Sequence, residues 1–246
     1  MKKLFLFCSI VLLVSCSKTV DDDVEIDSTV SGDVPEVYKK IYGASRITVE
    51  GEFVVIKVGG APDHSSPYYD RSNALYAGYN GVNPDFNLNP NQINTFDFSY
   101  KIPLNPKEAS NKSNTRLGSI GVSLNGVAIF NQYAGPNLPL TNEINSFDQY
   151  NGHPEKTGVY HYHIEPLYLT QEKGKEALMG FLLDGFPVYG PEENGSKVNN
   201  SDLDAYHGHQ HATSDFPDGI YHYHITDNDP YINGNQYFGT PGTVTQ

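Results

Sequence analysis

The chain carries one pattern of tyrosine and histidine twice, at Tyr160–His163 and at Tyr221–His224. Neighbouring side chains of an extended strand point to opposite faces, so each copy presents two tyrosines on one face and two histidines on the other. Histidines two residues apart lie about 6.6 Å apart at Cα, and their rings can lean together to chelate a metal through bonds of about 2.1 Å. The pattern therefore predicts metal binding.

The histidines of the two copies can serve one metal ion or two. We expect all four imidazoles to gather around a common ion; if the strands lie apart, two sites remain and each needs further ligands. The predicted metal ligands are all histidines: His161, His163, His222, His224, His209 and His64. Further candidates are His153, His207 and His211. An all-imidazole set favours Zn or Cu, with Fe and Ni as alternatives, over Ca or Mg.

The chemistry at such a site stays open at this level. Metal binding or sequestration needs a closed ligand set, whereas hydrolytic or oxidative catalysis needs an open coordination position. Because imidazoles must be neutral to bind a metal, we expect affinity to fall below about pH 6. In the alternative interpretation, the strands are structural parts of a non-catalytic module that binds glycans or proteins. Spacing alone assigns no catalytic residue.

An internal repeat surrounds the two patterns. Residues 120–130 align without gaps on residues 179–189, and residues 158–164 align on residues 219–225. The first pair holds Asn125-Gly126 and Asp184-Gly185, which favour type I′ hairpin turns because both central positions need positive φ. The repeats, within residues 120–169 and 179–232, each predict a hairpin, a connector and a Tyr-His-Tyr-His strand. We expect the two units to pack about a pseudo-two-fold axis.

Outside the repeats, periodicity predicts a few more elements. Residues 47–58 are rich in β-branched side chains and predict a strand interrupted at Gly51, and residues 96–102 predict a second strand. Residues 35–42 and residues 170–179 predict short helices, the latter with Thr170 as its N-cap. The fold class we expect is mainly β: a sandwich-like or barrel-like single domain over residues 35–246, with one or two short helices.

Composition narrows the functional classes. The 246 residues include 16 basic and 29 acidic side chains, a formal net charge of −13, which argues against a nucleic-acid partner. No P-loop, G-x-S-x-G, H-E-x-x-H or Rossmann glycine pattern is present in the sequence. The two cysteines, Cys8 and Cys16, lie near the start of the chain, so the domain itself has no disulfide and no thiolate ligand.

The first residues predict export and a membrane anchor. Residues 1–15 contain two lysines and an apolar run, the pattern of a signal peptide. The quartet Leu13–Cys16 resembles a bacterial lipoprotein box, which implies cleavage before Cys16 and acylation of that cysteine. The acyl chains would then hold the protein on a membrane.

An acidic segment follows the lipid cysteine. Residues 16–34 include Asp21, Asp22, Asp23, Glu25 and Asp27, and we expect them to form an extended tether. Such a block resembles the signal that sends some Gram-negative lipoproteins to the outer cell face. The prediction is an outer-membrane lipoprotein exposed at the cell surface. Its partners would be the membrane, through the acyl anchor, and a metal ion; any other ligand stays open.

Further motifs accompany the Tyr-His-Tyr-His strands: Leu183–Pro191 (LDGFPVYGP), Asp202–Asp204 (DLD), Phe216–His224 (FPDGIYHYH) and Gly239–Gly242 (GTPG). Together, from roughly Ile47 onward, they resemble the YHYH domain family of bacterial secreted proteins and lipoproteins. The resemblance implies no particular reaction, since the family is named for its motif. Members often carry a cysteine shortly after DLD and another near the C-terminus. This chain has Tyr206 and Asn233–Asn235 there, so any family disulfide is absent.

Overall fold

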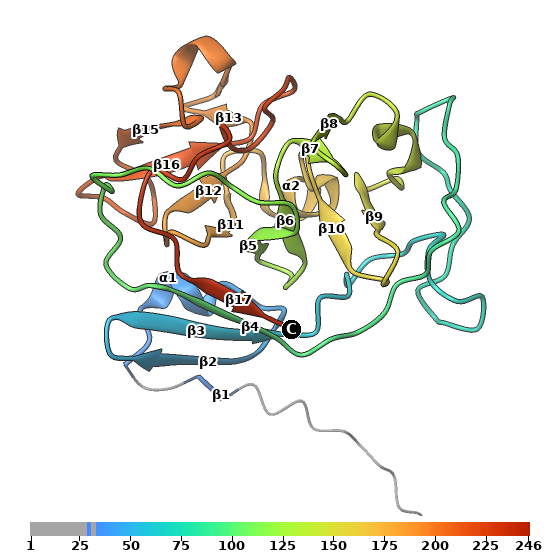
Figure 1. The fold of residues 1–246 in the computed structure, drawn as a ribbon, viewed down its shortest axis with the longest axis horizontal. Helices are drawn as coiled ribbons and strands as arrows, with labels where there is room; N and C mark the ends of the chain where they lie inside the picture. The colour runs from blue at the N-terminus through green and yellow to red at the C-terminus, as the bar shows by residue number, and fades with distance from the viewer. Residues whose placement is uncertain (1–28, 31–32) are drawn as a thin grey trace, which may run out of the picture.

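The computed structural model describes residues 29–30 and 33–246, which form a mainly β fold (Figure 1). One five-stranded and one eight-stranded sheet dominate it, beside two small two-stranded sheets. Both large sheets are open rather than closed into a barrel. The prediction of a mainly β fold with one or two short helices is therefore confirmed, and of its two forms the open, sandwich-like one applies.

The five-stranded sheet has the order β1-β2-β3-β4-β17. Its strands are β1 (Thr29–Val30), β2 (Ala44–Glu50), β3 (Phe53–Val58), β4 (Phe98–Pro103) and β17 (Thr243–Thr245). The strand predicted over residues 47–58 is two strands, because Gly51, at φ +62°, reverses the chain between β2 and β3. The strand predicted at residues 96–102 is confirmed as β4.

The eight-stranded sheet has the order β15-β16-β12-β11-β5-β6-β10-β9. Its strands are β5 (Ser119–Ser123), β6 (Ala128–Phe130), β9 (Gly152–Pro154), β10 (Tyr160–Tyr162), β11 (Leu178–Leu182), β12 (Pro187–Tyr189), β15 (Gly208–His211) and β16 (Ile220–His224). Outward from the central pair β5–β11, one side runs β6, β10, β9 and the other β12, β16, β15. This order is the one that a pseudo-two-fold axis between β5 and β11 produces, as the internal repeat predicts.

Each hairpin turns at its predicted dipeptide, but not through a type I′ turn. In Asn125-Gly126 only the glycine has positive φ, at +80°, and Gly185 repeats this at +86°. The Gly126 N–H donates to the Ser123 carbonyl at 2.9 Å, and the second hairpin has the equivalent bond. A type I turn followed by a left-handed glycine is the usual three-residue hairpin.

The helices are short. The helix α1 (Glu36–Lys39) confirms the one predicted within residues 35–42. The helix α2 (Leu167–Lys173) begins before the predicted start: Pro166, not Thr170, is its N-cap, and Thr170 lies inside it. Gly174, at φ +94°, ends α2, so the predicted continuation to residue 179 is wrong and Leu178 already belongs to β11.

The remaining elements are turns of 3₁₀ helix and two-residue strands. They are η1 (Glu143–Ser146), η2 (Asn200–Asp202), β7 (Tyr133–Ala134), β8 (Leu138–Pro139), β13 (Glu192–Glu193) and β14 (Ser196–Lys197). Two of them, η1 and β13, each bring a glutamate close to histidines of the neighbouring β strands.

The main core forms between the two large sheets, which lie one below the other in Figure 1. Ile56 and Tyr100 of the five-stranded sheet and Val122 and Phe181 of the eight-stranded sheet belong to one buried cluster. Removing such side chains from water is the dominant favourable term in folding. The face of the eight-stranded sheet that holds the tyrosines of β10 and β16 is buried as well.

A long loop covers the outer edge of the eight-stranded sheet. Residues 59–95 contain no helix or strand, and they pass beside β9 in Figure 1. The Asn89 amide donates to the carbonyl of Pro154, at the end of β9, at 3.1 Å. The loop thereby fixes the strand that carries His153.

The predicted signal peptide, Cys16 and the acidic run lie outside the described residues. Within the predicted tether, β1 pairs in parallel with β2, with Thr29 opposite Arg46, and Val34 is buried. The folded domain thus begins inside the segment predicted as tether. Among the described residues, no helix combines the length and apolar character needed to cross a membrane.

Candidate metal centres

The histidines of the two Tyr-His-Tyr-His strands belong to two separate groups. Site 1 consists of Glu143, His153, His161 and His163. Site 2 consists of Glu193, His209, His222 and His224. Within each site, one nitrogen or oxygen atom from every residue lies within 4.8 Å of the others.

The prediction of one shared ion is wrong, and its alternative of two sites with further ligands is the observed arrangement. The strands β12, β11, β5 and β6 stand between β16 and β10 in the sheet, which separates the sites by roughly 24 Å at about 4.8 Å per strand. The pseudo-two-fold axis lies between β5 and β11. It therefore places the two Tyr-His-Tyr-His strands, β10 and β16, in opposite halves of the sheet rather than side by side (Figure 1).

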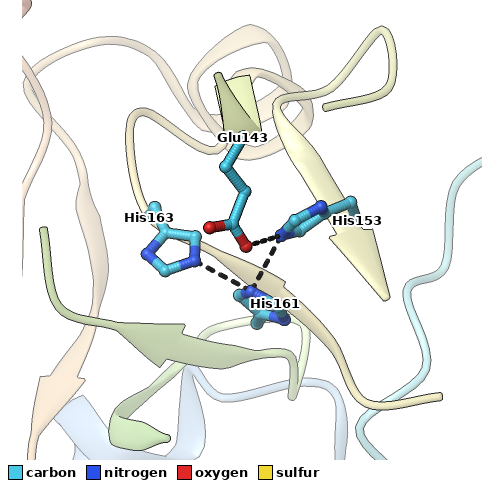
Figure 2. A group of neighbouring side chains, drawn as sticks. All are labelled: Glu143, His153, His161 and His163. Atoms are coloured by element: carbon cyan, nitrogen blue, oxygen red, sulfur yellow. Dashed lines mark hydrogen bonds and ion pairs between the residues drawn. The ribbon is translucent and has the colours of Figure 1, made fainter. Parts of the chain in front are cut away.

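Site 1 joins two adjacent strands and one 3₁₀ turn. Register pairing sets His153 of β9 opposite His161 of β10. The Nε2 atom of His161 lies 3.1 Å from Nε2 of His153 and 2.9 Å from Nε2 of His163. Glu143 descends from η1, and its Oε1 lies 3.2 Å from Nε2 of His153 (Figure 2). Four ligands around Zn at about 2.1 Å would place neighbouring nitrogens about 3.4 Å apart, close to these distances.

Site 2 repeats this geometry on the other side of the axis. His209 of β15 lies opposite His222 of β16. The Nε2 atom of His222 is 3.1 Å from Nε2 of His209 and 3.2 Å from Nε2 of His224. The carboxylate comes from Glu193 of β13, whose Oε1 is 3.6, 3.7 and 4.0 Å from the three Nε2 atoms.

Backbone carbonyls fix which ring nitrogen carries the proton. In site 1, Nδ1 of His161 donates to the Val159 carbonyl at 3.0 Å, and Nδ1 of His163 donates to the Asn131 carbonyl. A carbonyl oxygen only accepts, so in the neutral rings both Nε2 atoms keep a lone pair and carry no hydrogen. These two lone-pair nitrogens nevertheless face each other at 2.9 Å. A cation held between them would convert that repulsion into coordination.

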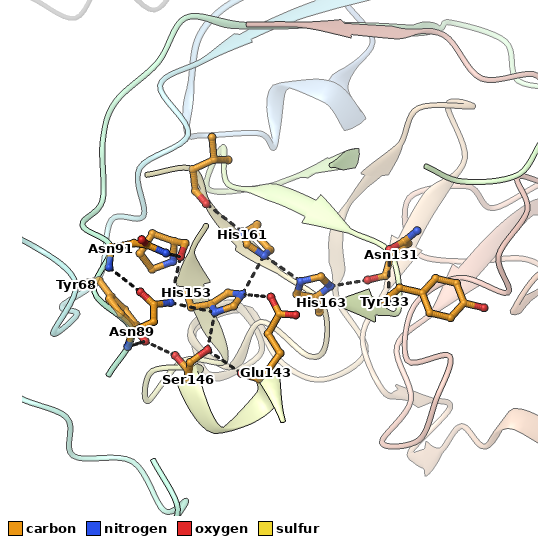
Figure 3. Close-up of polar contacts among 12 residues, drawn as sticks. Tyr68, Asn89, Asn91, Asn131, Tyr133, Glu143, Ser146, His153, His161 and His163 are labelled. Atoms are coloured by element: carbon orange, nitrogen blue, oxygen red, sulfur yellow. Dashed lines mark hydrogen bonds and ion pairs between the residues drawn. The ribbon is translucent and has the colours of Figure 1, made fainter. Parts of the chain in front are cut away.

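Ser146 extends the arrangement to the third imidazole of site 1 (Figure 3). Its hydroxyl donates to the Glu143 carbonyl at 2.7 Å and lies 2.7 Å from Nδ1 of His153. The side-chain amide of Asn89 contacts the same Nδ1 at 3.4 Å. Partners of this kind orient a metal-binding histidine.

Backbone carbonyls also accept hydrogen bonds from the Nδ1 atoms in site 2. Nδ1 of His222 donates to the Ile220 carbonyl at 3.0 Å, and Nδ1 of His224 donates to the Gly190 carbonyl at 2.8 Å. Ile220 and Gly190 hold the repeat positions of Val159 and Asn131, so both tautomer-setting bonds are duplicated with the ligands.

The tyrosines of each pattern hold the strand from its opposite face. Tyr160 donates to Asp148 at 2.9 Å, and Tyr221 donates to Asp204 at 3.0 Å. Each aspartate precedes the turn that leads to the third histidine of its site. Tyr223 donates to Asp184, in the hairpin loop, at 2.6 Å. The tyrosine positions therefore align the two strands that supply the imidazoles.

Burial lowers the pKa of the imidazoles on both Tyr-His-Tyr-His strands. Desolvation holds the pKa of His161 well below its usual value and lowers the pKa of His163 and of His224 to about 4. It also lowers the pKa of His209 and of His222. The neutral form, which binds metals, therefore persists in more acidic solution than for a free histidine. Metal affinity is therefore expected to fall at a lower pH than the value of about 6 expected from the sequence alone.

The carboxylates of the two sites stay ionised. Burial raises the pKa of Glu143, but its hydrogen bond to His153 and the charges of His153 and His163 outweigh this, so the net shift is downward. For Glu193, burial likewise raises the pKa, whereas contacts with His211 and other histidines lower it further than burial raises it. Each site therefore brings three imidazole nitrogens together with one negative oxygen.

The lowered histidine pKa values predict that the metal-free protein loses stability in mild acid. Between about pH 6.5 and pH 4 the unfolded chain protonates His163 and His224, whereas the folded chain does not. The unfolded state then binds more protons, so the free energy of unfolding falls as pH falls, by about 1.4 kcal/mol per pH unit for each such histidine. Urea unfolding in EDTA at pH 7, 6 and 5 measures it.

A buried aspartate has the opposite effect on stability in acid, so its contribution must be separated from that of the histidines. Burial raises the pKa of Asp184 to about 6, so its protonation stabilises the fold as pH falls below 6. The double variant His163→Gln/His224→Gln keeps Asp184 and removes the two histidines. Its free energy of unfolding should depend less on pH than that of the wild type; equal slopes would contradict the assignment.

Three histidines named from the sequence lie outside both sites. The predicted ligand His64 is on the tyrosine face, where its Nε2 lies 2.9 Å from the Tyr162 hydroxyl, because it packs against the opposite side of β10. His207 is buried in a left-handed turn at φ +74°, with its Nε2 3.0 Å from the Thr226 hydroxyl. His211 is exposed and contacts Glu193 at 3.2 Å from outside site 2.

The third histidine of each site had a sequence signal that the repeat alignment did not use. Residues 148–153 read DQYNGH and residues 204–209 read DAYHGH, a shared D-x-Y-x-G-H pattern. The pattern finds His153 and His209 together with the aspartates that hold the tyrosines. No such signal marks the glutamates, because Glu143 and Glu193 lie at different distances from these motifs and on different kinds of element.

Comparison with known proteins identifies one sequence family. The sequence model of the family described as YHYH protein matches residues 99–201 and 192–239, which is more than half of the chain and includes all eight residues of the two sites. No curated protein and no solved structure matches the chain.

Proposed function

This chain belongs to the YHYH protein family, and we propose that it binds two transition-metal ions, one at each of the two sites. Three buried or half-buried imidazoles and one carboxylate converge at each site, and no thiol competes with them in the described residues. Nitrogen donors with one carboxylate suit Zn²⁺ and Cu²⁺, and Fe and Ni are the alternatives.

One observation carries the proposal. In each site the Nδ1 atoms of both Tyr-His-Tyr-His imidazoles donate to carbonyls, and the Nε2 lone pairs face one another at 2.9 to 3.2 Å. A structural role for these strands, as in a module that binds glycans or proteins, gives no reason to bury lone pairs against each other. A metal ion at each site supplies that reason.

The proposed setting is the outer face of a bacterial envelope. We propose that cleavage before Cys16 and acylation of this cysteine attach the protein to the outer membrane, with the acidic segment as spacer. There the sites would meet extracellular metal, either to sequester it or to use it. A ligand set of three imidazoles and one carboxylate supports hydrolytic or oxidative chemistry wherever one coordination position stays open.

Metal analysis tests the proposal directly. After chelation and dialysis against Zn²⁺ or Cu²⁺, the purified, tag-free protein is expected to hold two ions per chain by elemental analysis. Less than about half an ion per chain after reloading would contradict metal binding and favour the structural module. One ion per chain would mean that only one of the two sites binds metal.

A further inference from the structure

The two sites have the same types of ligand, three histidines and one glutamate each, but they border different cavities. A cavity of about 590 Å³ lies beside site 1 and includes Glu143, His161 and His163 among its lining residues. This volume lies within the usual range for small-molecule sites, roughly 300 to 1,000 Å³. The cavity therefore gives a small molecule access to the same atoms that would hold the metal.

Apolar side chains form much of this cavity. They are Phe98, Leu117, Phe130, Tyr133 and Val159. Phe130 stacks on His161, with ring centroids 3.8 Å apart and planes 17° apart. A planar apolar surface thus continues directly from one of the metal-binding imidazoles. Flat aromatic groups gain both buried area and stacking geometry on such a surface.

The cavity beside site 2 is of another kind. It measures about 440 Å³ and has charged or polar walls that include Lys173, Lys175, Glu176 and Glu192. Tyr189 stands where Phe130 stands in site 1, and its ring is nearly perpendicular to that of His222, at 70°. Its hydroxyl is paired with Thr213 and Asp215 at 2.8 and 3.0 Å. Site 2 therefore lacks the flat apolar surface. It serves as an internal control, because it has the same types of metal ligand without that surface.

Charge indicates the group that would meet the metal. A divalent ion with three neutral imidazoles and the Glu143 carboxylate retains one positive charge, which one anionic oxygen donor neutralises. We propose that site 1, with its metal bound, binds small aromatic compounds that carry an anionic oxygen donor, with the ring lying between Phe130 and Leu117. This inference rests on the proposed metal binding and adds a ligand class to one of the two sites.

Two hydroxamates that differ only in their organic substituent provide the test. Benzohydroxamate and acetohydroxamate share the same metal-binding group and differ in a phenyl against a methyl group. Calorimetry on the Zn²⁺-loaded protein should find one benzohydroxamate per chain, bound about tenfold or more tightly than acetohydroxamate, because the phenyl group buries more apolar area. His222→Ala, which removes site 2, should leave this binding unchanged, whereas His161→Ala should abolish it.

A variant at the cavity mouth separates the aromatic preference from the metal. Leu117 is 46% exposed and contributes no atom to site 1, so the neutral polar substitution Leu117→Gln should keep the metal content and the affinity for acetohydroxamate while losing the preference for benzohydroxamate. Leu138→Gln is the matched control, since Leu138 is 55% exposed and lies outside the residues that line this cavity. It should behave as wild type.

The outcomes distinguish this inference from the proposed function. Metal content, measured before any hydroxamate is added, reports on the two metal sites alone. Full metal loading with equal affinity for both hydroxamates, or with benzohydroxamate bound at site 2, would overturn the aromatic pocket and leave metal binding intact. Absence of metal would overturn both.

Discussion

His161→Ala is expected to reduce metal content from two ions per chain to one, and His222→Ala to do the same at the other site. Each histidine is central to its site: Nε2 of His161 lies within 3.1 Å of both other imidazole nitrogens, and Nε2 of His222 within 3.2 Å. Outer partners of metal ligands alone are worth 10- to 100-fold in affinity, so loss of a ligand should cost more than about 100-fold. Elemental analysis after dialysis at micromolar Zn²⁺ measures the content.

The double variant and a matched control make this result specific. His161→Ala/His222→Ala should hold no metal. His211→Ala removes an exposed histidine that contacts Glu193 yet lies outside site 2, and it should retain two ions. A single variant that loses both ions would show that the sites depend on each other, contrary to the separation of β10 and β16 in the sheet.

Bound metal is expected to raise the free energy of unfolding and the Tm of the protein. Free Zn²⁺ at about 1,000 times its dissociation constant adds about 4.1 kcal/mol to the free energy of unfolding for each site, provided that the unfolded chain does not bind it. For a chain of this size, 1 kcal/mol shifts Tm by about 2 to 4 °C, so one site should raise Tm by roughly 8 to 16 °C. Differential scanning calorimetry with Zn²⁺ and then with excess EDTA measures it.

The variants provide the controls for the thermal shift. His161→Ala and His222→Ala should each keep about half of the Zn²⁺-dependent increase in Tm, because one site remains in each. The double variant should melt at the same temperature with Zn²⁺ and with EDTA. A double variant that Zn²⁺ still stabilises would place the bound metal somewhere other than these sites.

The local part of both sites could be predicted from the chain alone. Alternation along a strand requires His161 and His163 to share a face, and the duplication requires His222 and His224 to repeat it. The hairpin dipeptides marked the right positions, although Asn125 does not have positive φ and the turns are of another type. The strand over residues 47–58 was predicted as one element, because a single glycine does not show by itself whether a strand bends or reverses.

The ligands from other elements were harder to predict. His153 and His209 reach their sites through strand register, and Glu143 and Glu193 through a 3₁₀ turn and a two-residue strand that carry no periodic signal. His64 was assigned to a site from its residue type, whereas packing places it on the tyrosine face of β10.

Residue pattern was thus sufficient for a duplicated, mainly β domain with paired histidines, because strand alternation and turn preference act between neighbours in the chain. The number of candidate metal sites depended on the order of strands in the eight-stranded sheet. That order follows from packing β5 against β11 about the pseudo-two-fold axis and burying both repeats against the five-stranded sheet. These contacts join residues far apart in the chain, so no local spacing encodes them.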